Sequence, residues 1–87
     1  MPLVMAYHDV DDVQRWLASP TRQEVFGPLG VTDIRTFVDP QGSNKVGVLM
    51  DIPDMDAVMA MMDSDVGIDA MATDGVHADT LTILVAS

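Results

Sequence analysis

The stretch VTDIRTFVDPQGSNKVGVLMDI, residues 31–52, predicts two β-strands joined by one turn. Apolar side chains alternate with polar or small ones in Val31–Asp39 and again in Lys45–Ile52, as they do in half-buried strands. The intervening residues 39–44, DPQGSN, are rich in the residue types that form turns. We therefore expect an antiparallel hairpin in the middle of the chain.

Pairing the two strands of this hairpin assigns their side chains to two faces, because opposed residues in a sheet lie on the same side. We expect helices to cover the more apolar face, which carries Ile34, Thr36 and Val38 opposite Met50, Val48 and Val46. The other face carries Asp33, Arg35 and Phe37 opposite Asp51, Leu49 and Gly47.

Helices are predicted on both sides of the hairpin, at Asp12–Phe26 and Met55–Thr73. Asp12 is a good N-cap for the first of them. Ser19-Pro20 interrupts that helix, and Thr21–Glu24 has the pattern of a capping box that restarts it. The second helix is expected to kink at Ser64-Asp65 and to stop at Asp74-Gly75.

The outermost elements are predicted strands at Leu3–Val10 and Thr80–Ala86. The complete order βαββαβ is that of two split βαβ units, an α+β ferredoxin-like fold. We expect residues 1–87 to form one domain, with a four-stranded antiparallel sheet and two helices on one face. The first and third strands would be central, and the first and fourth would pair.

The first strand is apolar on both sides, which is unusual for a sheet that helices cover on one face only. Leu3, Met5 and Tyr7 lie on one side, and Val4, Ala6 and His8 lie on the other. A strand that is apolar on both sides is buried on both sides. The simplest cover is a second copy of the sheet related by a two-fold axis, so the sequence predicts a homodimer.

A cleft between the two sheets of such a dimer is the expected ligand site, since it would be mostly apolar with a few polar groups. Its expected ligand-binding residues are Tyr7, Trp16, Arg35, Phe37 and Leu49. The expected ligand is a small apolar or aromatic molecule, with or without a negative charge. Which side of the first strand lines the cleft is left open, because a one-residue shift in register reverses it.

The net charge of −10, with only four Lys and Arg residues, excludes nucleic acid and anionic membranes as main partners. No apolar run approaches the roughly 20 residues of a membrane span. Cysteine is absent, and the start of the sequence, MPLVMAYHD, has no basic region of a secretory signal. We therefore expect a cytoplasmic protein.

The segment HDVDDVQRW, His8–Trp16, resembles the junction between the first strand and first helix of small dimeric α/β-barrel proteins. In that superfamily, a His that ends the strand is followed by Asp and then Trp at four-residue intervals, which matches His8, Asp12 and Trp16. The resemblance implies a ferredoxin-like dimer. Its members include cofactor-free monooxygenases and cyclases, haem-degrading enzymes and lactone isomerases. The oxygenases and haem-degrading members use an Asn beside a Trp, whereas the one Asn here, Asn44, lies in a turn.

His8 and His77 are the candidate catalytic residues, because an imidazole needs only a small pKa shift to act as an acid or base near neutral pH. For His8, the alternative is a structural role at the end of the strand. Arg35 could hold an anion in the cleft, or form a salt bridge with Asp33 or Asp51, within one subunit or across the dimer. Trp16 could line the cleft mouth or belong to the core.

Two functions remain open from the sequence. One is an enzyme that transfers protons, such as a cyclase or isomerase, or a cofactor-free monooxygenase. The other is a non-catalytic binding protein or structural dimer. We expect no cofactor, since the chain has no phosphate-binding Gly-rich loop, and no metal, since no His spacing fits a known site.

Overall fold

The computed structural model describes residues 2–87 and contains the predicted order of strands and helices, with both helices divided. The elements are β1 (Leu3–Val10), α1 (Val13–Ala18), α2 (Thr21–Phe26), the 3-10 turn η1 (Gly27–Leu29), β2 (Thr32–Val38), β3 (Lys45–Asp51), α3 (Met55–Asp63), α4 (Asp65–Thr73) and β4 (Val76–Val85).

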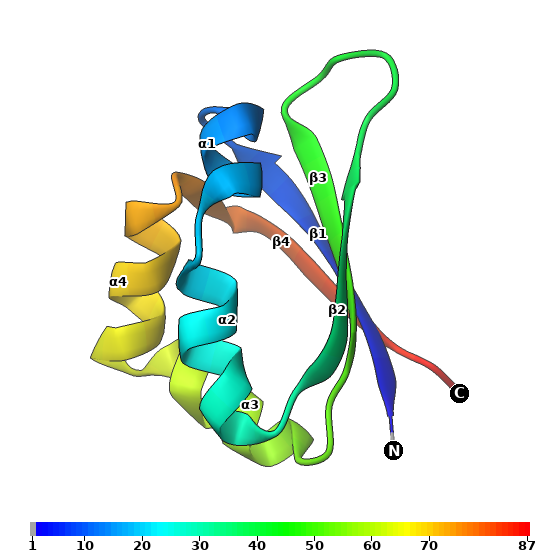
Figure 1. The fold of residues 1–87 in the computed structure, drawn as a ribbon, viewed down its shortest axis with the longest axis vertical. Coiled ribbons are helices and arrows are strands. Elements are labelled where there is room, and N and C mark those ends of the chain that lie inside the picture. The colour runs from blue at the N-terminus through cyan, green and yellow to red at the C-terminus, as the bar shows by residue number, and fades with distance from the viewer. Residues whose placement is uncertain (1) are drawn as a thin grey trace.

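The four strands form one antiparallel sheet in the order β2-β3-β1-β4, so β1 and β3 are central as predicted. All four α-helices lie on one side of this sheet, and the other side is left bare (Figure 1). The α+β ferredoxin-like fold predicted from the sequence is therefore confirmed.

The predicted register of the central hairpin is confirmed over most of its length. Arg35 lies opposite Leu49, and Phe37 lies opposite Gly47. The register shifts near the start of β2, where Thr32 rather than Asp33 lies opposite Asp51. Asp33 has a φ of 55°, a left-handed conformation that fits an irregularity in the strand and that the alternating pattern does not reveal.

The first predicted helix divides at Ser19-Pro20, as expected. The carboxylate of Asp12 accepts hydrogen bonds from the backbone N–H groups of Gln14 and Arg15, so the predicted N-cap is confirmed. The predicted capping box of α2 is wrong, because Thr21 is already the first helical residue. Its backbone N–H instead donates to the Ser19 hydroxyl at 3.2 Å.

The second predicted helix divides at Ser64, which ends α3 and caps α4 through the backbone N–H of Gly67. Gly67 sits where two helices meet closely. A Cβ atom at this position would collide with the backbone of Met61 and Met62. The change of direction therefore needs a residue without a side chain at this point.

The last strand begins at Val76, four residues earlier than the predicted start at Thr80. Its pairing with β1 is irregular between Tyr7 and Asp9, where the register shifts. The Thr80 hydroxyl accepts the backbone N–H of Asp9 at 2.8 Å and so replaces a missing ladder hydrogen bond. In the sequence, residues 77–79, HAD, carry no large apolar side chain, so the early part of the strand resembled a loop.

The core lies between the sheet and the helices. Val4 and Val10 of β1, Val46, Val48 and Met50 of β3, and Trp16 of α1 are buried there. The bare side of the sheet exposes large apolar side chains, among them Leu3, Met5, Phe37 and Leu84. No helix within residues 2–87 is long and apolar enough to cross a membrane.

Candidate ligand cavity between the helices and the sheet

A cavity of about 90 Å³ lies between the helices and the covered side of the sheet. Its walls are almost entirely apolar, and five of its lining residues are methionines: Met50, Met55, Met61, Met62 and Met71. Methionine side chains are flexible and can repack around different shapes. The cavity can therefore enlarge beyond its present volume without a change in the backbone.

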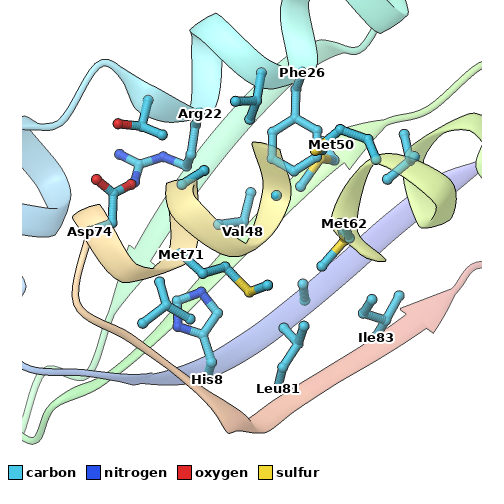
Figure 2. Close-up of a pocket in the computed structure, with 18 of the residues that line it drawn as sticks. His8, Arg22, Phe26, Val48, Met50, Met62, Met71, Asp74, Leu81 and Ile83 are labelled. Carbon is cyan, nitrogen blue, oxygen red and sulfur yellow. The ribbon is translucent and has the colours of Figure 1, made fainter. Parts of the chain in front are cut away.

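The polar groups of the cavity gather at one end. His8, Arg22 and Asp74 lie there, while Phe26, Met62 and Ile83 lie toward the other end (Figure 2). Figure 2 also shows the ends of the Arg22 and Asp74 side chains pointing toward each other. This asymmetry gives the cavity one polar and one apolar end.

His8 lies buried at the polar end of the cavity. The residue is only 6% exposed, and its Nδ1 atom is buried without a hydrogen-bond partner among residues 2–87. Its ring meets Trp16 edge-on, with 5.7 Å between the ring centroids. Burial lowers the pKa of His8 below its ordinary value, an effect opposed by the nearby Asp9 backbone, so the imidazole is neutral at pH 7.

Arg22 is held beside His8 by contacts from three directions. Its guanidinium carbon lies 4.2 Å from the Trp16 ring centroid, and its Nη1 atom donates to the Trp16 carbonyl at 2.9 Å. The same nitrogen lies 4.0 Å from the Asp74 carboxylate. Burial lowers the pKa of Arg22 and Asp74 raises it, but an arginine stays protonated at neutral pH.

Asp74 is a buried carboxylate at the end of α4. Its Oδ1 atom accepts a hydrogen bond from the Ser19 hydroxyl, and its Oδ2 atom faces Arg22. The pair is well enclosed, since the Arg22 and Asp74 side chains are 13% and 6% exposed. A positive and a negative charge thus lie side by side at the polar end, with a neutral imidazole next to them.

The structure separates the residues that the sequence analysis assigned to one cleft. His8 and Trp16 line the cavity on the covered side, and Trp16 is a core residue at 1% exposure. Tyr7, Arg35, Phe37 and Leu49 belong to the bare side of the sheet. Four of the five expected ligand-binding residues thus share one face, while Trp16 takes the core position that was its alternative; consecutive strand residues such as Tyr7 and His8 point to opposite faces. The ligand cleft on the bare side stays a prediction.

The bare side has its own shallow hollow, of about 210 Å³, lined in part by Tyr7, Phe37 and Gly47. The Lys45 ammonium lies 5.5 Å from the Tyr7 ring centroid and 3.3 Å from the Asp9 carboxylate. The hollow is the more open of the two, whereas the cavity with His8 lies between two layers of structure and is partly closed to solvent. The cavity is therefore the stronger candidate for a binding site.

His77 does not line the cavity. It lies opposite Asp9 in the pairing of β1 with β4, which confirms the predicted strand order. Its Nε2 atom bonds to the Asp11 carboxylate, and both side chains are largely exposed. This contact raises the pKa of His77 and lowers the pKa of Asp11. The second histidine thus has a partner of its own outside the cavity.

Arg22 and Asp74 are the cavity residues that the sequence analysis missed. Arg22 falls inside the segment interpreted as a capping box, and Asp74 was interpreted only as part of a helix stop. Residues 52 positions apart in the chain give no local pattern that pairs them. The sequence did offer one signal. With four Lys and Arg residues and 14 Asp and Glu residues, each cation can be expected to pair with a carboxylate, although the sequence does not show which one.

Solved structures share this fold along the whole chain. A candidate antibiotic biosynthesis monooxygenase from Bordetella bronchiseptica matches with a TM-score of 0.70 and 11% identity, over 99% of this chain and 94% of that one. One from Nitrosomonas europaea matches with a TM-score of 0.64 and 10% identity, over 100% and 97%. A dimeric ferredoxin-like protein of unknown function from Jannaschia sp. CCS1 matches with a TM-score of 0.62 and 16% identity, over 100% and 99%.

These matches confirm the resemblance to monooxygenase-like proteins of the ferredoxin-like dimeric α/β-barrel type as a resemblance of fold. No protein-family model matches the sequence, and no curated protein matches it. At identities of 10–16%, the shared fold does not carry an activity from those proteins to this chain. The function must be argued from the cavity itself.

Proposed function

We propose that this chain is a small homodimeric protein that binds a small, mostly apolar molecule in the cavity beside His8. The unpartnered Nδ1 atom of His8 carries the proposal. A buried polar atom without a partner costs free energy in the empty protein, and a ligand that donates a hydrogen bond removes that cost. A cytoplasmic location is part of the proposal and rests on the sequence alone.

His8 also supports a reaction class for the enzymatic version of this function. A neutral imidazole in an apolar pocket can take a proton from a bound molecule, as a general base does. Cyclisation, isomerisation and cofactor-free oxygenation each fit a site that starts with such a step. The non-catalytic alternative uses the same contact for binding only, and turnover of a bound molecule distinguishes the two.

Filling the cavity tests the binding proposal. Toluene, as an apolar probe, should raise the melting temperature of the protein, and the rise should grow with the logarithm of its concentration once the site is filled. The substitution Ala70→Leu adds a larger side chain to the cavity wall and should remove this effect. Ala60→Leu, on the exposed side of α3, is the matched control and should leave the effect unchanged. Equal toluene responses in all three proteins would contradict the proposal.

The homodimer is proposed from the bare side of the sheet. Leu3, Met5, Phe37 and Leu84 expose apolar surface there, and solvent-facing groups of this size are typical of interaction surfaces. The same side carries Arg35, which is exposed, and the Asp51 Oδ1 atom, which is buried without a hydrogen-bond partner among residues 2–87. A two-fold interface brings each patch against its own copy, and we propose that it places Arg35 of each subunit near Asp51 of the other.

Sedimentation equilibrium at micromolar concentration tests the dimer. The measured mass should be about twice the chain mass of 9.4 kDa. A monomer under these conditions would contradict the homodimer but not the binding proposal, since every residue of the cavity comes from one chain.

A further inference from the structure

We propose that Asp74 sets the ligand specificity of the cavity: by pairing with Arg22 it reserves the cavity for uncharged apolar molecules, among which those with one hydrogen-bond donor bind more tightly. This inference rests on the proposed binding function and adds the chemical class of the ligand. It concerns Arg22 in this cavity, while the sequence-based expectation that Arg35 holds an anion on the bare side stays a prediction.

The charges around the cavity cancel. Arg22 contributes one positive charge and Asp74 one negative charge, and their side chains are both enclosed at a separation of 4.0 Å. His8 contributes none while its imidazole is neutral. Lys45 and Asp9, the other charged groups that act on His8, form their own pair at 3.3 Å on the bare side of the sheet.

An anion in this cavity would be buried without a free counter-charge. Burying an ionised carboxylate is costly unless it is paired and hydrogen-bonded. The Arg22 guanidinium cannot supply that pairing freely, because its Nη1 atom already donates to the Trp16 carbonyl and its charge faces Asp74. Figure 2 shows this end of Arg22 directed at Asp74.

A neutral donor, by contrast, needs no counter-charge. With its proton on Nε2, the buried Nδ1 atom of His8, which has no hydrogen-bond partner among residues 2–87, can accept a hydrogen bond from a ligand once neighbouring side chains move to admit it. An O–H or N–H group on an apolar body can bond there while the rest of the molecule packs against the methionines. The volume of about 90 Å³ is smaller than the roughly 150 Å³ of a cavity that takes benzene, so a ligand of one ring fits only when the methionine side chains repack around it.

Three single-ring probes separate the ligand classes at pH 7: toluene is neutral without a donor, phenol is neutral with a donor, and benzoate is an anion. Isothermal titration should detect toluene and phenol but not benzoate. The ratio of phenol to toluene affinity should be about fivefold higher in the wild-type protein than in the His8→Leu variant. Benzoate binding tighter than phenol, or an unchanged ratio in His8→Leu, would overturn this inference.

The role of Asp74 is tested by removing its negative charge, which leaves the positive charge of Arg22 without a partner. Asp74→Asn should raise benzoate affinity at least about tenfold, because the guanidinium then lacks its internal partner. Asp69→Asn removes the same charge from the exposed side of α4 and should leave benzoate unbound. Adding Arg22→Met to Asp74→Asn should abolish the gained benzoate binding.

Further measurements separate a folding defect, and a failure of the proposed binding function, from a failure of this inference. If Asp74→Asn does not fold, Asp74→Ser serves instead, since its hydroxyl can still bond to Ser19 and it carries no charge. A folded Asp74 variant that binds phenol as the wild type does but gains no benzoate binding would overturn this inference and leave the binding function standing. Failure of the wild-type protein to bind any of the three probes would overturn the binding function and this inference with it.

Discussion

Neighbouring residues of one strand lie in different environments on the two sides of the sheet. His8 faces the helices, is 6% exposed and lines the cavity between the helices and the sheet, whereas Tyr7 faces the bare side beside exposed Phe37. Both sides carry apolar groups and a buried polar atom, but only the covered side gathers them around one cavity between two layers. The comparison shows that a ligand site needs enclosure as well as apolar surface, and that the bare side is better suited to a second subunit.

The largest effect is expected on the covered side, at Trp16. Trp16→Ala should lower the free energy of unfolding by about 3–5 kcal/mol, because it removes a fully buried ring and the surface on which Arg22 stacks. Urea denaturation measures this loss. Trp16→Phe keeps an aromatic ring and should lose less, and a loss below about 1 kcal/mol for Trp16→Ala would mean that the ring is not part of the core.

On the bare side, a change of similar size should affect assembly rather than folding. Phe37→Asp places a charge in the proposed interface and should raise the dimer dissociation constant at least about thirtyfold, the effect of losing one interface hot spot. Sedimentation measures the dimer, and circular dichroism should show that the chain stays folded. Phe37→Leu is the control and should stay dimeric; unfolding of Phe37→Asp would place Phe37 in the core instead.

Local sequence patterns were sufficient to predict the fold, because alternation, turn residues and helix caps each depend on only a few neighbouring residues. Alternation and turn residues predicted the hairpin and its register from Arg35 to Val38, and Asp12 was correctly predicted as a cap. The site was predicted only in part, since alternation shows that Tyr7 and His8 face opposite sides but not which of them shares the helix-covered face of the hairpin. The contact between Arg22 and Asp74 depends on how α2 packs against the end of α4, and no local pattern contains it.

The pH dependence of stability should separate the two histidines, and His8 gives the larger effect. Its pKa is lowered by burial, so the unfolded chain takes up a proton near pH 6.5 while the folded chain does not. His8 should therefore reduce stability as the pH falls through 6.5 toward its own lower pKa. In urea denaturation between pH 5 and 8, His8→Leu should remove this loss, whatever its effect on stability at pH 8. If the free energy of unfolding falls with pH as steeply in His8→Leu as in the wild-type protein, His8 is not a neutral, buried residue.

His77 should show the smallest effect, with the opposite sign. Asp11 raises its pKa, so the folded chain holds its proton more tightly than the unfolded chain, and the contact stabilises the protein fully below pH 6.5. That stabilisation is lost as the pH rises through the higher pKa of folded His77. Because both side chains are exposed, the gain is small and salt should screen it. His77→Gln should therefore remove the gain in stability that His77 gives as the pH falls from its higher folded pKa to 6.5, and it should leave the loss below pH 6.5 that His8 causes unchanged. NMR titration should find the His77 ring titrating above the His8 ring. If the two rings titrate in the reverse order, the enclosed and exposed environments assigned to them here are exchanged, and His77 becomes the better candidate for a base.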